Sequence, residues 1–393
     1  MFRNVKRSGR SRPEGNRGKP RREGWISVSL NRRFVSLAAV AAAGALALSA
    51  CAANETQSQP AAQGGNGGEQ LSGQLKGQGS SAQKVAQDTW IKNFQTANPG
   101  VTINYSPDGS GAGRDGFKGG GVDFAGSDRA FKPEENTAGA FGKCEASSKA
   151  LDIPVYVSPI AISFNVEGVQ DLNLDAATTA GIFKGTIAKW NDPAIVALNP
   201  GVQLPDAAIV PVHRSDNSGT TENFTDWLNK AAGDVWTDKA SGDWPASLKG
   251  EAAKGTAGVV AAVKNGKNTI GYVDESQARE LNNAKIGADG NFSEPSAQAA
   301  GEALAASPVE SGRDANDLAI KIDRKAAGYP VYMVSYALVC QDYKDDKTAQ
   351  LVKSYIGSIT SSEGQQAAAQ AAGAAPLPEK LSGQVKTAVD SIK

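Results

Sequence analysis

The sequence predicts an α/β fold, and three observations support that class. The chain has 393 residues, which is enough for two domains or for one large one with a sizeable core. From Leu71 onward, short runs rich in β-branched and aromatic residues alternate with stretches whose apolar residues recur at helical spacing. Such alternation is typical of layered α/β proteins with mainly parallel sheets.

The predicted strands are β-branched or aromatic, and the predicted helices carry apolar residues on one face. In chain order the strands are VTINYS (101–106), VDFAGS (122–127), IPVYVSPIAISFNV (153–166), AAIVPVHRS (207–215), NTIGYVD (268–274) and YPVYMVSYALV (329–339). The helical faces are Ala86, Trp90, Ile91 and Phe94; Phe224, Trp227 and Leu228; residues 258–263; and residues 349–359.

The first fifty residues have the pattern of a secretory signal. Arg32 and Arg33 precede an apolar run (34–48) that is shorter than the roughly 20 residues needed to span a bilayer. The run ends in LSAC (48–51), which resembles the lipobox of bacterial lipoproteins. We therefore expect residues 1–50 to be a lipoprotein signal peptide and Cys51 to be the lipidated first residue of the mature chain. The alternative is an ordinary signal peptide with a chance cysteine.

Residues 51–70 contain almost no apolar residues beyond alanine. This composition predicts a flexible tether, which would hold the folded part just outside a membrane.

The formal net charge of zero hides a segregation of charges. Residues 1–50 carry eleven Lys/Arg and two Asp/Glu, which leaves thirty basic and thirty-nine acidic residues in the remainder. Proteins that bind nucleic acid normally show the opposite sign. Nucleic acid is therefore not an expected partner.

Two cysteines remain in the mature chain, Cys144 and Cys340. In an oxidising compartment a disulfide between them is plausible, and it would place distant parts of the chain in one domain. The alternative is two buried thiols. A metal site is not expected, because the whole mature chain offers one histidine besides these cysteines.

Four loops have a similar position and composition. Each follows a predicted strand or opens a predicted helix, and each consists of Gly, Ser, Thr and one or two charged residues. They are GQGSSA (77–82), DGSGAGR (108–114), AGSDR (125–129) and HRSDNSGTT (213–221). Small residues let backbone N–H groups approach a ligand, and a helix N-terminus supplies unpaired donors. One such loop is weak evidence, because glycine-serine turns are common, but four in one chain predict an anion site.

The loops also lie within longer motifs. These are GQGSSAQ with Trp90 following, NYSPDGSGAG, VDFAGSDRAF, IAKWNDPAIVALNPGVQLP, HRSDNSGTTENFTDWL, NTIGYVD and YPVYMVSYALV. With them the chain resembles, from about Leu75 to about Gly364, the PstS family, the phosphate-binding lipoproteins of the high-affinity phosphate ABC transporter. The resemblance implies a two-lobed, periplasmic-binding-protein-like fold of type II, with dehydrated phosphate in the cleft between the lobes.

Carried over by position, the resemblance implies a set of phosphate contacts. They are Ser81, Ala82, Ser110, Asp128, Arg214, Ser218, Gly219 and Thr220, with Asp216 bracing Arg214 rather than meeting the ion. Two departures matter. Ala82 stands where some relatives have a larger side chain and offers only its N–H, and the GSGAG run is poorer in hydroxyl groups, which puts one or two hydroxyl contacts in doubt.

Asp128 suggests how the ion is selected. An ionised carboxylate can only accept hydrogen bonds, and phosphate near neutral pH always carries an O–H to donate, whereas sulfate does not. Sites built around such a bond reject analogues that lack it by about 10⁴–10⁵. By residue type alone, Asp128 would be a helix N-cap in a tight turn, and the family resemblance favours the ligand role.

Three other polar residues have structural alternatives. His213, the only histidine, is expected to be a strand-end residue beside Arg214, because no GxSxG elbow accompanies it. Arg114 and Arg129 flank the loops and are either solvated or add positive potential at the mouth of the cleft.

We expect two α/β lobes, with the chain crossing between them twice: lobe I from 71–157 and 327–393, and lobe II from 158–326. The expected function is extracytoplasmic phosphate binding and delivery to the membrane permease of an ABC transporter, by a lipid-anchored monomer without a cofactor and without enzymatic activity. The alternatives are a secreted phosphatase, for which no metal cluster or nucleophile–base pair is apparent, a phosphate-sensing surface lipoprotein, and a binding protein for another oxyanion, which Asp128 disfavours.

Overall fold

The computed structural model describes residues 70–325 and 328–393. The predictions for residues 1–69, including the signal peptide, the lipidation of Cys51 and the tether, lie outside the described residues. None of the described helices combines the length and the apolar character needed to cross a membrane.

The described residues form a large mixed sheet in the order β2-β1-β3-β12-β4-β8-β6-β7, with β9 also paired to β4. A smaller sheet has the order β11-β10-β5. The strands of the first half are β1 (Gly73–Gly79), β2 (Val101–Ser106), β3 (Phe124–Ser127), β4 (Ala150–Asn165), β5 (Asn173–Leu174) and β6 (Val210–Arg214). Those of the second half are β7 (Glu251–Ala253), β8 (Thr269–Asp274), β9 (Asn282–Asn283), β10 (Lys285–Ala288), β11 (Asn291–Ser293) and β12 (Tyr332–Cys340).

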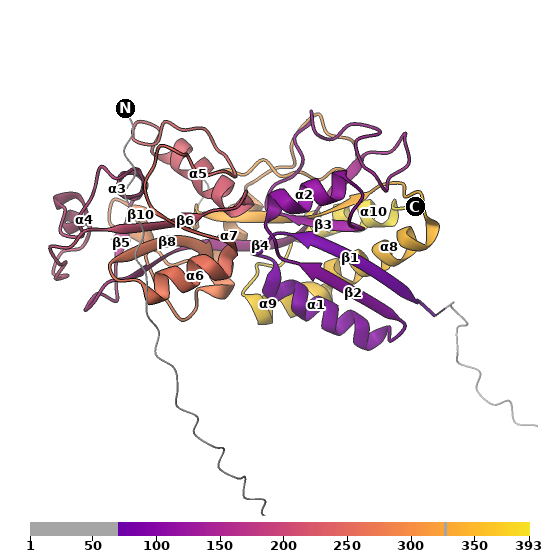
Figure 1. The fold of residues 1–393 in the computed structure, drawn as a ribbon, viewed down its shortest axis with the longest axis horizontal. Coiled ribbons are helices and arrows are strands. Elements are labelled where there is room, and N and C mark those ends of the chain that lie inside the picture. The colour runs from indigo at the N-terminus through magenta and orange to yellow at the C-terminus, as the bar shows by residue number, and fades with distance from the viewer. Residues whose placement is uncertain (1–69, 326–327) are drawn as a thin grey trace, which may run out of the picture. The chain divides into compact units, whose positions relative to one another are not determined.

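Two long buried strands, β4 and β12, run through the centre of this sheet (Figure 1). β12 pairs with the first part of β4, from Cys340 opposite Ala150 to Tyr332 opposite Pro159. The rest of β4, from Ile160 onward, pairs with β8. The chain therefore leaves one half of the sheet along β4 and returns along β12.

These central ladders are antiparallel, so the expectation of mainly parallel sheets is wrong for the middle of the sheet. The reason is the double crossing, because two strands that carry the chain out and back must run in opposite directions. The flanks do follow the expectation: β1 is parallel to β2 and β3, and β6 is parallel to β7 and β8.

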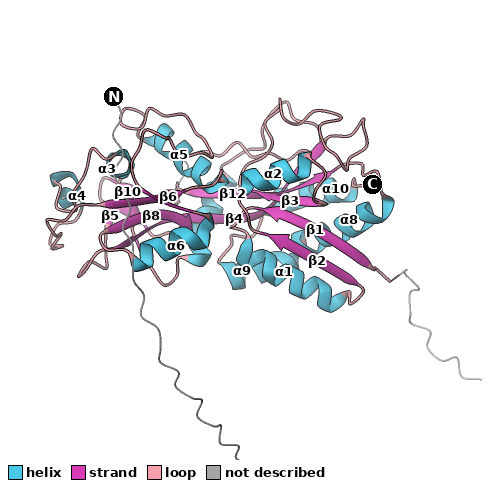
Figure 2. Cartoon of the chain, in the orientation of Figure 1, coloured by secondary structure: helices cyan, strands magenta, loops and turns pink. Residues whose placement is uncertain are grey.

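Helices cover both faces of the sheet, with α2 and α5 on one side and α1, α6 and α9 on the other (Figure 2). The first five are α1 (Lys84–Ala97), α2 (Ser110–Lys118), α3 (Ala176–Lys184), α4 (Pro193–Leu198) and α5 (Gly219–Ala231). The others are α6 (Gly255–Asn265), α7 (Ala297–Ala305), α8 (Asp346–Thr360), α9 (Ser362–Ala372) and α10 (Glu379–Asp390), with a 3₁₀ turn η1 (Glu275–Gln277). Of the predicted apolar faces, Ala86, Trp90 and Phe94 in α1 and Phe224, Trp227 and Leu228 in α5 are buried, and Ile91 is half-buried.

The C-terminal helices pack beside the N-terminal strands. Trp90 on α1 donates from Nε1 to the carbonyl of Gly364 at 2.7 Å, and Cys144 is bonded to Cys340 with their Cα atoms 5.3 Å apart. The predicted disulfide is thus confirmed, and it closes a loop across a sequence separation of 196. Closing so long a loop typically stabilises a fold by roughly 2–5 kcal/mol, mainly by restricting the unfolded chain.

Candidate functional site

The four glycine- and serine-rich loops meet at one edge of the sheet. They follow the carboxyl ends of β1, β2, β3 and β6, and three of them lead directly into α1, α2 and α5. In open α/β sheets this edge is where ligands bind, because helix N-termini and their unpaired N–H groups point toward it.

Asp128 lies at the centre of this meeting point, directly after β3, and is 2% exposed. Its Oδ1 accepts a hydrogen bond from Ser335 Oγ at 2.7 Å, and its Oδ2 accepts one from Thr220 Oγ1 at 3.1 Å. Asp128 starts no helix, so the N-cap alternative is wrong. The hydroxyl groups of Ser335 and Thr220 thus satisfy this buried carboxylate, and both of its oxygens act as acceptors.

Ser110 and Gly219 lie next to Asp128 and belong to two different helices. Ser110, the first residue of α2, accepts from the backbone N–H of Asp128 at 3.1 Å and so keeps its own hydroxyl proton free to donate. A Cβ on Gly219, the first residue of α5, would lie 2.6 Å from Asp128 Cβ and 2.7 Å from Ser110 Oγ. Only glycine fits where these two helix N-termini approach so closely.

Arg214 is the last residue of β6 and is 3% exposed. Its Nε donates to Asp216 Oδ1 at 2.8 Å and its Nη2 to Asp216 Oδ2 at 2.5 Å, in a bidentate pair. Although burial opposes it, the bonds from Arg214 lower the pKa of Asp216. Among the described residues Nη1 of Arg214 has no hydrogen-bond partner, so one arm of a fixed guanidinium remains available to an anion.

The bracing of Arg214 involves neighbours on both sides. Asp216 Oδ1 also accepts from the N–H of Gly255 at 2.9 Å, at the start of α6. Gly109 has a φ of +104°, and a Cβ there would lie 2.3 Å from Asp216 Oδ2. Glycine is therefore required at Gly109 both by its backbone conformation and by the closeness of Asp216.

Behind Arg214 lies Tyr272 of the NTIGYVD motif. Its hydroxyl accepts from the N–H of Arg214 at 3.2 Å and is 2.8 Å from Thr221 Oγ1. Burial raises the pKa of Tyr272 to about 12, so this hydroxyl stays protonated. The ring stacks on Phe224 at 4.3 Å, which fixes α5 against β8.

Ser81 and Ala82 occupy the turn between β1 and α1. Ser81 Oγ accepts from the N–H of Thr256 at 3.0 Å and is 3.1 Å from Thr256 Oγ1, while its carbonyl accepts from Gln277 Nε2 at 2.9 Å. The N–H of Ala82 donates to Ser80 Oγ at 3.1 Å. These partners already engage Ser81 and Ala82, so a ligand would have to share or replace those bonds.

The start of α5 brings Ser218, Gly219 and Thr220 together. Ser218 is the N-cap, and its Oγ accepts from the N–H of Thr221 at 3.2 Å. That bond leaves the hydroxyl proton of Ser218 free, and the first-turn N–H groups of the helix add further donors. This part of the predicted set therefore forms one donor-rich corner.

Arg114 and Arg129 are both engaged in contacts rather than solvated. Arg114 is 5% exposed and donates to Ser127 Oγ and to Asn217 Oδ1, each at 2.9 Å. Burial lowers the pKa of Arg114. The first bond connects α2 to the end of β3, and the second connects α2 to the loop that follows Arg214.

Arg129 pairs with two glutamates, Glu135 at 2.6 Å and Glu222 at 2.9 Å. Although burial opposes it, the bonds from Arg129 lower the pKa of Glu135 to about 2. Because Glu222 lies on α5 and Arg129 follows β3, this pair also joins segments far apart in the sequence.

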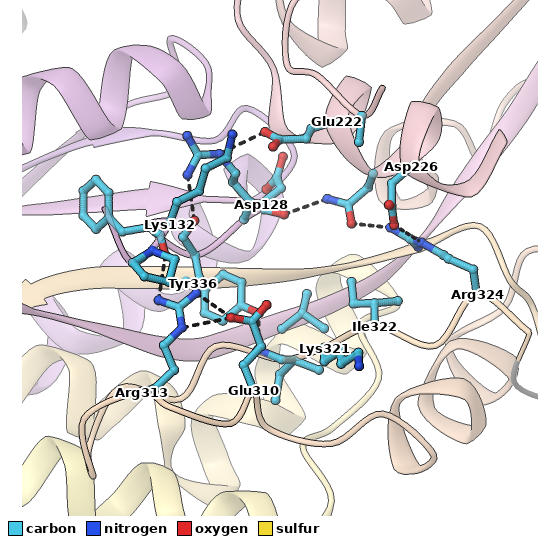
Figure 3. Close-up of a pocket in the computed structure, with 18 of the residues that line it drawn as sticks. Asp128, Lys132, Glu222, Asp226, Glu310, Arg313, Lys321, Ile322, Arg324 and Tyr336 are labelled. Carbon is cyan, nitrogen blue, oxygen red and sulfur yellow. Dashed lines mark hydrogen bonds and ion pairs between the residues drawn. The ribbon is translucent and has the colours of Figure 1, made fainter. Parts of the chain in front are cut away.

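A cavity of about 280 Å³ flanks Asp128 (Figure 3). Arg313 reaches Glu310 at 2.6 Å, and Arg324 reaches Asp226 at 2.9 Å. The predicted anion contacts Arg214, Ser110 and Ser218 do not line it. Since its arginines are neutralised by carboxylates, this cavity is not the predicted anion site.

His213 has a structural role. Its ring stacks on Trp244 at 4.8 Å with an interplanar angle of 10°, and its Nδ1 lies 3.0 Å from the carbonyl of Arg214. Within residues 70–325 and 328–393, no group of three or more His, Cys, Asp or Glu side chains could hold a metal ion.

Sequence reasoning missed several residues that support the site. They are Gln83, Asn217, Asn223, Gly255, Thr256, Gln277 and Ser335. Ser335 had a usable signal, because it is a polar residue in the middle of an otherwise largely apolar predicted strand. The others depend on contacts between loops that are distant in the sequence.

The chain matches known proteins over most of its length. A profile of the PBP superfamily domain matches residues 64–363. The chain is 38% identical over 328 residues to phosphate-binding protein PstS 3 of Mycobacterium leprae (strain TN), which covers 81% of this chain and 86% of the relative. It is 36% identical over 381 residues to phosphate-binding protein PstS 3 of Mycobacterium tuberculosis (strain ATCC 25618 / H37Rv), covering 93% and 100%.

Solved structures share the fold at lower sequence identity. A high-affinity periplasmic phosphate-binding protein (PfluDING) bound with phosphate has a TM-score of 0.64 and 22% identity, and covers 80% of this chain and 93% of its own. The phosphate-binding protein of Stenotrophomonas maltophilia has a TM-score of 0.63 and 22% identity, covering 80% and 94%. These similarities confirm the predicted two-lobed α/β fold.

Proposed function

The chain belongs to the PBP superfamily, among its PstS phosphate-binding proteins, and from that premise we propose that it binds inorganic phosphate outside the cytoplasm and delivers it to an ABC transporter for import. Its relatives are named as binding proteins, and we infer that this chain also binds its ligand without transforming it.

The observation that carries the proposal is the convergence of neutral donors around one carboxylate and one guanidinium. Ser110, Ser218 and Thr220 supply hydroxyl groups from two helix N-termini, Arg214 supplies a braced positive charge, and Asp128 supplies the acceptor. We propose that these residues, with Ser81, Ala82 and Gly219, contact phosphate, and that Asp216 holds Arg214.

The energetics explain why so many donors are needed. A charge-assisted hydrogen bond contributes roughly 1.5–3 kcal/mol net, whereas micromolar affinity requires about 8 kcal/mol after the costs of binding. A single arginine cannot replace the hydration of an oxyanion, but several converging O–H and N–H donors can. Asp128 then accepts the proton that phosphate carries and sulfate lacks.

The surroundings of the site support a binding protein with two moving lobes. We propose that the lobes are 71–157 with 327–393 and 158–326, and that permease subunits in the membrane recognise the closed form. We also propose that Cys51 anchors the chain by a lipid and that it acts as a monomer without a cofactor. The extracytoplasmic setting agrees with the family and with the disulfide Cys144–Cys340.

Calorimetric titration of the full-length protein, after bound ion has been stripped, tests the proposal. We expect phosphate to bind with at least micromolar affinity, and a large excess of sulfate to leave that affinity unchanged. Strong competition by sulfate would contradict the role of Asp128, and no heat with phosphate would contradict the function itself. Release of product from a chromogenic phosphate ester would instead favour a phosphatase.

A further inference from the structure

The two oxygens of Asp128 have different kinds of partner. Oδ2 accepts from Thr220, which belongs to the predicted phosphate contacts. Oδ1 accepts from Ser335, a fully buried residue in the middle of β12 that is not among them. One oxygen is therefore on the side of the ligand contacts, and the other is held by the sheet.

Ser335 is itself the end of a directed chain of hydrogen bonds. Its Oγ accepts from Gln83 Nε2 at 2.6 Å, Gln83 Oε1 accepts from Gln87 Nε2 at 2.9 Å, and Gln87 Oε1 accepts from Tyr355 at 2.7 Å. Burial raises the pKa of Tyr355 well above its ordinary value, so its hydroxyl remains a donor. Every group in the chain thus donates toward Asp128.

This chain fixes the direction of the serine hydroxyl. A serine has one proton to donate, and Gln83 already occupies an acceptor position on Oγ. The other acceptor within reach is the carbonyl of Ser127 at 3.4 Å, which is much farther than Asp128 Oδ1 at 2.7 Å. The proton of Ser335 is therefore committed to the carboxylate.

We propose that Ser335, oriented by Gln83, is a positioning residue that determines specificity: it holds Oδ1 of Asp128 and so presents Oδ2 to the ligand as an acceptor, which makes the site demand an oxyanion that carries a proton. This inference rests on the proposed function. A carboxylate held by a hydrogen bond on one oxygen keeps its other oxygen in a fixed direction, where only a donor on the ligand can satisfy it. Thr220 also donates to Asp128, but as a predicted phosphate contact it is expected to turn to the ion, so Ser335 is the donor that remains.

Other charged and titratable groups surround Asp128. Tyr105 on β2, Arg114 on α2 and Asp274 at the end of β8 act on it through space, and the Arg129–Glu222 pair lies beside it. None of these groups bonds Ser335, so we expect a substitution there to leave them in place. A comparison of that variant with the native chain at each pH therefore isolates the contribution of Ser335.

The test is Ser335→Ala in the full-length, ion-stripped protein, titrated calorimetrically with phosphate and with sulfate at pH 5 and pH 8. We expect phosphate to bind about 10- to 100-fold more weakly than to the native chain. We also expect sulfate, which the native chain should exclude, to become a measurable ligand at both pH values, because a carboxylate that Ser335 no longer holds can turn away from the ion. Ser163→Ala is the matched control, since Ser163 on β4 is equally buried and bonds Asn283 at 2.6 Å; both ions should behave as with the native chain.

Two further variants keep the proposal testable if Ser335→Ala does not fold. Ser335→Thr retains the hydroxyl and should exclude sulfate at both pH values. Gln83→Met removes the donor that orients Ser335 and should also admit sulfate. If Ser335→Ala or Gln83→Met weakens phosphate binding while sulfate stays excluded at both pH values, Ser335 only packs and the proposal is wrong. If the native chain itself fails to bind phosphate, the proposed function fails instead.

Discussion

At the scale of single residues, buried carboxylates in this protein differ according to what bonds them. Asp216 is held by a bidentate arginine, whereas Asp128 accepts from two hydroxyl groups. Asp274 likewise accepts from neutral donors, the hydroxyl of Tyr156 and the N–H of Ser276. The first two carboxylates lie at the predicted site, whereas Asp274 lies at the end of β8.

The substitution Asp128→Asn tests the carboxylate at the site directly. An amide presents an N–H where the carboxylate presented only acceptors, so it can donate to an unprotonated oxyanion. We expect phosphate affinity to fall about 10- to 100-fold and sulfate to become a measurable ligand. Competition titrations in both ions check this outcome, and continued exclusion of sulfate would show that other groups select the ion.

The buried carboxyl group of Asp274 makes the free energy of unfolding depend on pH. Burial raises the pKa of Asp274 from its ordinary 3.8 to about 7. The folded protein therefore holds this proton more tightly than the unfolded chain, and the stabilisation, on the order of 4 kcal/mol, is present at low pH and lost as pH rises through about 7. Asp152, whose pKa is raised by burial and by Asp317 beside it, contributes with the same sign.

The variant Asp274→Asn has no carboxyl group to titrate at this position. We expect its free energy of unfolding to fall less between pH 5 and pH 8 than that of the native chain, while Asp152 preserves part of the slope. Chemical denaturation at several pH values measures this difference. Parallel curves for the two proteins would mean that Asp274 does not titrate in this range.

At the scale of elements, the ends of α2 and α5 determine the geometry of the site. Both helices begin at a glycine: Gly109 directly precedes α2, and Gly219 is the first residue of α5. The contacts that this permits are short, since the N–H of Gly111 donates to the carbonyl of Asn217 at 3.1 Å. The N-terminus of α2 thus donates to the loop that leads into α5.

Gly219→Ala should disrupt this approach. The added methyl group would meet Asp128 Cβ at 2.6 Å and Ser110 Oγ at 2.7 Å, and neither is the free end of a flexible side chain. We expect phosphate affinity to fall at least 10-fold, while the helix itself stays folded. Gly383→Ala is the control, because Gly383 in α10 has nothing within 4 Å of the added atom. Equal affinities in the two variants would contradict the close approach.

The helices and strands were largely predictable from the sequence. The contacts between residues of the candidate site were predictable only in part. The strand at 101–106 and the apolar face of α5 follow from local periodicity, which depends on neighbours in the sequence. The antiparallel centre of the sheet depends on the double crossing, which no local pattern reveals. The contact of Ser335 with Asp128 spans 207 positions, so residue type alone could not assign it.

At the scale of the whole described part, the predicted boundary of the second lobe at residue 326 remains a prediction. Contacts of the preceding segment favour an earlier return to the first lobe. The N–H of Leu318 donates to the carbonyl of Asp152 at 3.1 Å, the N–H of Ile320 to the hydroxyl of Tyr336 at 3.0 Å, and Arg313 to the carbonyl of Phe131 at 2.7 Å. We infer that residues 313–320 move with β4 and β12, whereas Arg324 still pairs with Asp226 of α5.

We infer that the described state is a closed one, because groups of the two proposed lobes bond directly. Arg114 bonds Asn217, Arg129 pairs with Glu222, and Ser81 bonds Thr256. Such contacts must break if the lobes separate about the two central strands, the hinge motion common in binding proteins. A buried anion would add attraction between the lobes, so the closed population should rise when phosphate binds.

Solution scattering of the full-length protein tests this motion. We expect the phosphate-free protein to have a larger radius of gyration than the phosphate-bound one. Glu222→Gln removes the charge that pairs with Arg129 and should open the phosphate-free form further, whereas Glu280→Gln removes a pair with Lys264 that is exposed to solvent and should change nothing. Since the bound ion supplies its own attraction, saturating phosphate should make all three proteins equally compact.

Identical scattering curves with and without phosphate would mean that the lobes stay closed. The ion would then have to enter through local opening of the loops at Ser81 and Ser218.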